Sequence, residues 1–213
     1  MNRRSFLVAS AASAAALIPA RYRRVHSAAL GFELTAYDDA TLNAIAAIGY
    51  RDVAINDLYA PALRAALTRA GLSASAVHVT TPLLYRGLER HLGVAASLGC
   101  RYFVCGRVDP EERRTQQDWH ELAALFNRAG ETARKAGLRF GYRVLGDEVG
   151  VVTAETDPAL VWFEAKIPGP RCFAVDLDET AGPSAVRAAG VEHYYVQAKS
   201  IDDARKRYDA LRS

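Results

Sequence analysis

The sequence predicts an α/β fold in which parallel strands alternate with helices along the chain. A helix-like stretch rich in Ala and Leu repeatedly ends at a glycine, and a short β-rich run follows within one or two residues. Glycine is the usual residue just past a helix end because it adopts the left-handed conformation at no steric cost. The order recurs in "AIGYRDVAI", "AGLSASAVHV", "SLGCRYFVC", "AGLRFGYRV" and "AGVEHYYVQ". The β-rich runs are short and apolar, as in parallel strands that are covered on both faces.

Eight runs qualify as strands, and eight parallel strands with outer helices make a (β/α)8 TIM-type barrel. The predicted strands cover residues 30–37, 51–57, 74–80, 101–107, 138–145, 161–167, 171–178 and 193–199. The predicted helices cover residues 40–48, 60–70, 86–98, 118–136, 184–189 and 202–211. We therefore predict a compact barrel with some crossover helices reduced or missing, because only "AETDPAL" and "IPGP" are left around the sixth strand. A flavodoxin-like open sheet is the alternative, but it would leave several strand-like runs unused.

The clearest helix is the one over residues 118–136. Leu122, Leu125, Phe126 and Ala129 recur at the spacing that places them on one helix face. This apolar stripe is typical of a helix that packs on the outside of a sheet.

Residues 1–29 have the layout of an export signal. The paired Arg3 and Arg4 are followed by "SFL" and a short run of small apolar residues, which resembles a twin-arginine leader. We predict cleavage after Ala29, a barrel domain over residues 30–213 and a periplasmic or exported location by the twin-arginine route. An uncleaved N-terminal anchor is the alternative. After cleavage, no stable membrane span is expected.

Removal of the leader changes the charge of the chain. Residues 1–29 contain five arginines and no acidic residue, so 22 basic and 24 acidic residues remain and the net charge is −2 instead of +3. This balance gives no indication of a nucleic-acid partner. The three cysteines (Cys100, Cys105 and Cys172) are an odd number without CxxC spacing, which favours buried thiols over a disulfide framework.

Several segments resemble the sugar phosphate isomerase/epimerase family of xylose isomerase-like barrels. The resemblance rests on "AIGYRDV", "SAVHV", "NRAGETARKAGLRFGY", "ETDPALVWFE" and "AGVEHYYVQ", which run in the same order from about residue 30 to the C-terminus. It implies a TIM barrel that acts on a small carbohydrate or sugar phosphate. In that family, carboxylates and a histidine at the C-terminal strand ends hold a divalent metal that assists hydrogen transfer between neighbouring carbons.

The expected metal ligands are replaced in this shortened chain. The family's fifth strand carries two histidines, where residues 142–148 here are YRVLGDE. Its sixth strand has an aspartate where Lys166 stands, and its eighth has acidic residues where Gln197 and Lys199 stand. The run "CFAVDLDE" fits either the seventh strand or a shifted copy of the sixth, with Asp176 as the retained aspartate. The resemblance therefore implies a degenerate metal site.

Five residues are candidates for ligand binding. The two-residue period of strands directs Arg143, Lys166 and Lys199 into the barrel mouth, where they would repel a metal and attract a phosphate or a sugar acid. Alternatively, these side chains extend to solvent. Glu33 replaces a frequent family glutamine and is either a ligand contact or a buried partner of a basic residue. Gln197 is the fifth candidate.

The catalytic residues stay unknown, with His78, Glu148 and Asp176 as candidates. His78 matches a family histidine and either contacts a sugar hydroxyl or is structural. Glu148 matches a family glutamate or is a solvated loop acid. Asp176 belongs to an acidic cluster near a strand end, for which a loop or helix-cap role is the alternative. The other histidines are expected to be structural or on the surface: His91, His120 and His193.

No metal site and no cofactor are predicted, but Mn or Mg would be implied if Asp176 and Glu148 formed a residual site. The function that follows is a sugar phosphate isomerase/epimerase-like barrel protein that acts on or binds a small carbohydrate and has lost the usual metal-dependent site. Whether it is an enzyme stays open at this point. The alternative is a non-catalytic binding protein for an anionic sugar or a protein partner.

Overall fold

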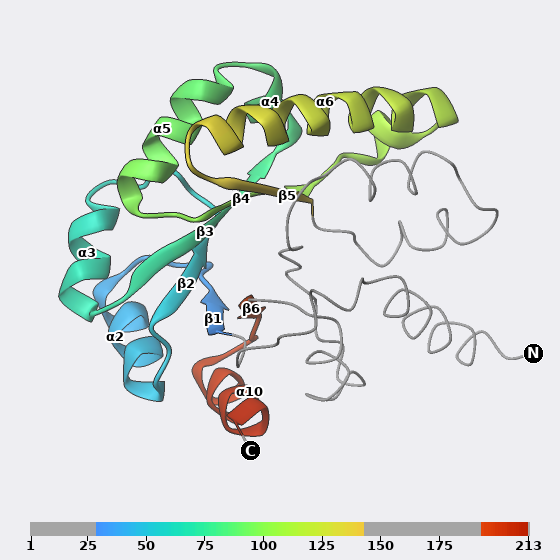
Figure 1. Cartoon of the computed structure of the whole chain (residues 1–213). Helices are drawn as coiled ribbons and strands as arrows, with labels where there is room; N and C mark the ends of the chain where they lie inside the picture. The colour runs from blue at the N-terminus through green and yellow to red at the C-terminus, as the bar shows by residue number, and fades with distance from the viewer. Residues whose placement is uncertain (1–28, 143–192, 213) are drawn as a thin grey trace, which may run out of the picture.

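A computed structural model describes residues 29–142 and 193–212, in which six parallel strands form one curled sheet (Figure 1). The strands are β1 (Ala29–Glu33), β2 (Asp52–Ile55), β3 (Ser73–Thr80), β4 (Tyr102–Arg107), β5 (Arg139–Tyr142) and β6 (His193–Val196). They are ordered β5-β4-β3-β2-β1-β6 across the sheet. Each of the first five strands thus lies beside its sequence neighbour, and the last described strand lies beside the first.

The pairing of β6 with β1 is the feature that identifies a barrel. Their parallel ladder runs from the Ala29–His193 pair to the Phe32–Val196 pair. A chain whose C-terminal strand returns to its first strand wraps around an axis, whereas an open doubly wound sheet reverses its strand order in the middle. The described half-barrel confirms the predicted TIM-type architecture. The predicted strands 161–167 and 171–178 and the helix 184–189 lie outside the described residues, between β5 and β6 in sequence.

The helices lie on the convex side of the sheet (Figure 1). They are α2 (Asp39–Ile48), α3 (Leu63–Ala70), α4 (Thr81–Tyr85), α5 (Leu88–Leu98), α6 (Gln116–Lys135) and α10 (Ile201–Arg212), with a 3-10 turn η2 (Pro110–Arg113). The predicted helices within this part of the chain are all present, with ends that differ by at most three residues. The short helix α4 was not predicted. None of the helices in residues 29–142 and 193–212 is both long and apolar enough to cross a membrane.

Local capping explains where the longest helix begins. The Thr115 side chain accepts a hydrogen bond from the backbone N–H of Asp118, and the Asp118 carboxylate accepts one from the N–H of Thr115. This capping box satisfies two amide groups that the first turn leaves unpaired. The predicted stripe of Leu122, Leu125, Phe126 and Ala129 is buried, so α6 packs on the sheet through that face.

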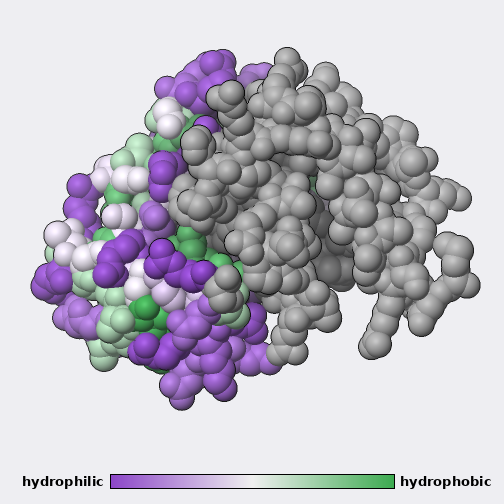
Figure 2. All heavy atoms as spheres, turned by 60° about the horizontal axis from the view of Figure 1, so that its bottom comes forward, coloured by the Kyte–Doolittle hydropathy of each residue, from purple (hydrophilic) through white to green (hydrophobic). Residues whose placement is uncertain are grey.

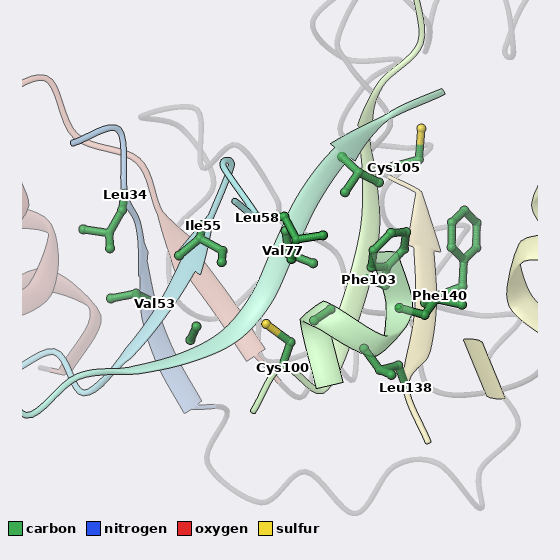
Figure 3. Packing of buried hydrophobic residues seen from close by; sticks show 14 of the residues in the cluster. Leu34, Val53, Ile55, Leu58, Val77, Cys100, Phe103, Cys105, Leu138 and Phe140 are labelled. Atoms are coloured by element: carbon green, nitrogen blue, oxygen red, sulfur yellow. The ribbon is translucent and has the colours of Figure 1, made fainter. Parts of the chain in front are cut away.

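The larger hydrophobic core fills the space between the sheet and the helices. Figure 3 shows strand residues such as Val53, Val77 and Phe103 pointing to the same side of the sheet. Cys100 and Cys105 are buried thiols in this core, which confirms the prediction for these two residues, whereas Cys172 lies outside the described residues. The described surface that faces the viewer in Figure 2 is mainly hydrophilic, with small hydrophobic areas.

A second, smaller core lies on the concave side of the sheet. It consists of Ala54, Ala76, Tyr102, Val104 and Tyr195, which alternate along their strands with residues of the larger core. This alternation follows from the two-residue period of a strand, which sends neighbouring side chains to opposite faces. The concave side is the interior of the barrel.

Candidate functional site

Three polar side chains meet on the concave side at the C-terminal ends of their strands. Glu33 is the last residue of β1, His78 is near the end of β3, and Gln197 directly follows β6. The structure therefore brings together one of the predicted catalytic candidates and two of the predicted ligand-binding residues. Active sites of (β/α)8 enzymes lie at this end of the barrel.

A small residue between the strands allows this contact. Glu33 pairs with Ala54 on β2, and Ala54 pairs with Ala76 on β3. Because neighbouring strands are about 4.8 Å apart, a side chain on β1 must reach across β2 to meet one on β3. The methyl group of Ala54 leaves that space open, so Glu33 can reach His78.

The Glu33 carboxylate is held from two sides. Its Oε1 lies 3.3 Å from Nδ1 of His78, and its Oε2 accepts a hydrogen bond of 2.8 Å from Nε2 of Gln197. Glu33 and His78 are only 9% and 7% exposed, so both groups are largely removed from water. The Nδ1 contact has the distance of an ion pair but not the geometry of a hydrogen bond.

The second ring nitrogen of His78 has no hydrogen-bond partner among the residues that the structure describes. Nε2 is buried and makes no hydrogen bond with any atom of the described residues. Leaving a polar group buried without a partner costs about 1–3 kcal/mol, so such groups call for an explanation. Nε2 of His78 could therefore form a hydrogen bond with a ligand that enters this end of the barrel.

An aromatic floor closes the barrel interior below this cluster. Tyr195 lies on β6 two residues before Gln197 and is 2% exposed. Its hydroxyl is 2.7 Å from Oγ of Ser75, and its ring covers Gly31, where a Cβ would lie 2.6 Å from the ring carbon Cδ1. The glycine is thus required by the ring, and the polar cluster stands on a closely packed base.

Two loops at the same end are joined by Tyr37, which the sequence analysis did not identify. Tyr37 lies between β1 and α2, and its hydroxyl accepts hydrogen bonds from the N–H groups of Asn56 (2.8 Å) and Asp57 (2.9 Å), which follow β2. The same hydroxyl donates to Oδ1 of Asn56. Burial raises the pKa of the Tyr37 phenol, while the two backbone N–H groups lower it, and the charges of Asp57 and Glu33 raise it. The net shift is upward, so the hydroxyl keeps its proton and can donate.

The predicted cationic cluster is described only at Lys199. Strand β6 ends at Val196 rather than at residue 199, so Lys199 is in the following loop and its side chain is exposed. Its backbone N–H donates to Oδ2 of Asp203 (3.0 Å), next to the start of α10. The predicted extension of this strand to residue 199 was therefore wrong. Four other candidates lie outside the described residues: Arg143, Glu148, Lys166 and Asp176.

The remaining histidines lie on other elements or at the opposite end of β6. His91 lies on α5, where its Nδ1 is 2.5 Å from the hydroxyl of Tyr59. His120 is exposed on α6, and His193 is the first residue of β6, at the opposite end of the strand from Gln197.

The described residues form no metal site. In residues 29–142 and 193–212, no three or more His, Cys, Asp or Glu side chains are grouped so that they could hold an ion. Glu33 and His78 supply two potential ligands, and the predicted residual ligands Glu148 and Asp176 lie outside this part of the chain. Two potential ligands are too few for a metal site, so the donor set within the described residues does not fit a metal.

Comparisons with known proteins place this geometry in context. No protein-family model and no curated protein matches the chain. Among solved structures, a sugar phosphate isomerase/epimerase from Parabacteroides distasonis is similar, with 17% identity, a TM-score of 0.62 and coverage of 90% of this chain and 97% of that chain. An L-ribulose 3-epimerase has 13% identity, a TM-score of 0.54 and coverage of 87% and 92%.

A xylose isomerase-like TIM barrel protein from Mycobacterium smegmatis, solved in complex with magnesium, has 13% identity, a TM-score of 0.52 and coverage of 81% and 86%. At these identities the likeness is one of fold. This chain of 213 residues has the fold of the xylose isomerase-like TIM barrels, which include sugar isomerases and epimerases.

Proposed function

We propose that this protein is a sugar phosphate isomerase/epimerase-like barrel protein that binds a small carbohydrate between Glu33, His78 and Gln197. The observation that carries the proposal is the buried Nε2 of His78, which has no hydrogen-bond partner within residues 29–142 and 193–212 and lies beside a fixed carboxylate. Sugar hydroxyls both donate and accept hydrogen bonds, so they complement a cluster that contains an acceptor carboxylate, an amide and an imidazole. The fold that the chain shares with sugar isomerases and epimerases supports this class of ligand.

The usual metal-dependent chemistry is proposed to be lost. In the family that the sequence resembles, acidic residues or histidines stand where this chain has Arg143, Lys166 and Lys199. A bound divalent metal would supply Lewis-acid polarisation of a sugar carbonyl, and positive side chains in place of its ligands would repel it. The same replacements favour a second candidate, a non-catalytic binding protein for an anionic sugar.

A thermal-shift experiment with the purified chain tests the proposal. The probes are L-ribulose, D-fructose, D-fructose 6-phosphate, inorganic phosphate and manganese chloride. A ligand that binds only the folded state stabilises it by RT ln(1 + [L]/Kd), or about 2.7 kcal/mol at a concentration of 100 Kd. We expect at least one sugar to raise the Tm in this logarithmic manner and manganese not to do so.

Matched variants localise the binding. His78→Ala should abolish the shift, because it removes the unpartnered ring, whereas His120→Ala on the exposed face of α6 should leave it unchanged. A carbon NMR spectrum of each stabilising sugar after prolonged incubation separates an isomerase from a binding protein, since only the former forms a new sugar. Stabilisation by manganese without any effect of sugars would contradict the proposal.

A further inference from the structure

The position of the proton on His78 follows from its surroundings. A neutral imidazole has one donor nitrogen and one acceptor nitrogen, and a carboxylate only accepts hydrogen bonds. Oε1 of Glu33 lies 3.3 Å from Nδ1 of His78. A proton on Nδ1 places a partial positive charge beside that carboxylate, whereas a bare Nδ1 would bring its own negative partial charge close to the carboxylate in a site that is largely removed from water. The electrostatics therefore favour the tautomer with the proton on Nδ1.

Glu33 is held firmly enough to exert this control. Gln197 donates to its second oxygen at 2.8 Å, so the carboxylate cannot rotate away from His78 without breaking that hydrogen bond. Both residues of the Glu33–His78 pair are more than nine-tenths buried, which leaves little water to compete for Nδ1. Second partners of this kind commonly determine which nitrogen of a functional histidine carries the proton.

We infer that Glu33 is a positioning residue that holds His78 with its proton on Nδ1, so that Nε2 presents a hydrogen-bond acceptor to the ligand. The inference deepens the proposed function and rests on it for the presence of a ligand. It defines the group that His78 recognises: a hydroxyl that donates a hydrogen bond. A phosphate or carboxylate oxygen cannot pair with an unprotonated Nε2, so the anionic part of any sugar phosphate lies elsewhere in the site.

The test reverses the tautomer by changing which groups around Nδ1 of His78 donate hydrogen bonds and which accept them. Glu33→Gln alone is not decisive, because the Gln197 amide can rotate and either accept from or donate to the new amide. Adding Gln197→Lys leaves only hydrogen-bond donors at position 197. The side-chain amide introduced at position 33 must then turn its carbonyl oxygen toward position 197 and its NH2 group toward Nδ1 of His78. His78 is then forced to carry its proton on Nε2. Adding Gln197→Glu instead leaves only acceptors, which restores the proton to Nδ1.

The primary readout is the long-range proton–nitrogen correlation spectrum of the histidine rings at a pH of about 8, above the ordinary titration range of imidazole. The signals of His78 are assigned by their loss in His78→Ala. We expect Nδ1–H in the unmodified protein, Nε2–H in Glu33→Gln/Gln197→Lys and Nδ1–H again in Glu33→Gln/Gln197→Glu. The measurement on the unmodified protein decides the question even if a variant fails to fold. An Nε2–H tautomer or a doubly protonated ring in that protein would overturn the inference.

The secondary readout separates the inference from the proposed function. With L-ribulose as the probe, the Gln197→Lys double variant should bind at least about tenfold more weakly than the Gln197→Glu double variant, since each 1.4 kcal/mol is a factor of ten. If the tautomers behave as expected but no sugar binds to any form, the carbohydrate function fails while the role of Glu33 stands. If the sugar binds equally to both double variants despite opposite tautomers, recognition through Nε2 is refuted.

Discussion

Gly31→Ala is the sharpest test of the barrel, because it perturbs the contact between the first strand and the last described strand. A Cβ at this position would lie 2.6 Å and 2.7 Å from the ring carbons Cδ1 and Cε1 of Tyr195, and 3.2 Å from the carbonyl oxygen of Asp52. Carbon atoms pack best at about 3.5–4.0 Å, so the ring would have to move by about 1 Å. The ring is buried, and its hydroxyl is fixed at Ser75, so neither end moves freely.

The expected loss can be estimated from similar perturbations. An extra methyl group forced into a well-packed core costs about 1–3 kcal/mol. For a domain of 150–250 residues, each kcal/mol corresponds to about 2–4 °C in Tm, so a decrease of about 2–12 °C is expected. Thermal and urea unfolding followed by circular dichroism would measure it. An unchanged midpoint would mean that the Tyr195 ring does not cover Gly31, and the β1–β6 pairing would then be in doubt.

Gly93→Ala is the matched control for the same substitution. Gly93 is an exposed residue inside helix α5, and a Cβ there would meet nothing within 4 Å. Alanine is favoured over glycine in a helix interior by about 0.5–1 kcal/mol, so this variant should be slightly more stable than the unmodified protein. Opposite signs for the two glycines would show that the loss at Gly31 arises from the ring and not from the loss of a glycine.

Three further predictions follow from local chemistry. Thr115→Ala should lower the free energy of unfolding by about 0.5–2 kcal/mol, as measured by urea unfolding, because it removes the N-terminal cap of α6. Thr132→Ala inside the same helix is the control and should change the free energy of unfolding little. Burial raises the pKa of the Cys100 thiol to about 12, so it should resist alkylation at a pH of about 8 until the protein is denatured, as peptide mass spectrometry can determine. We further propose that the twin-arginine export machinery recognises Arg3 and Arg4. Replacement of both residues by Lys should retain the precursor in the cytoplasm. Unaltered export of this variant in a fractionation assay would refute that route.

Most of the described fold could be predicted because its signals are local. Glycines that end helices and short apolar runs identify each strand and helix without knowledge of their neighbours. Helix α4 escaped prediction because its five residues, "TPLLY", are too few to show a helical period. The end of β6 was placed too late because Ser200 and Asp203 cap the next helix and draw the chain out of the sheet, which apolar patterning does not reveal.

The candidate site could be predicted residue by residue but not as an arrangement. Glu33, His78 and Gln197 were identified from strand position and family resemblance, yet their contact depends on register across three strands and on the small side chain of Ala54. Tyr37 was missed because its hydroxyl binds backbone groups 19 and 20 residues away, and no sequence motif marks a backbone N–H as a partner. Contacts of this kind are decided by tertiary structure.

The described barrel interior has two levels, the aromatic floor and the polar cluster above it, and they contribute differently to the stability of the protein. The lower level pairs Gly31 with the Tyr195 ring and satisfies the tyrosine hydroxyl at Ser75, so it buries apolar surface without unsatisfied polar groups. The upper level buries Glu33 and His78 and leaves both ring nitrogens of the histidine without a hydrogen bond within the described chain. A fold selected for stability alone would fill that level with apolar side chains, because an unsatisfied polar group lowers stability. Polar groups at the C-terminal strand ends, above a floor that is already well packed, therefore support the proposal that this level binds a ligand.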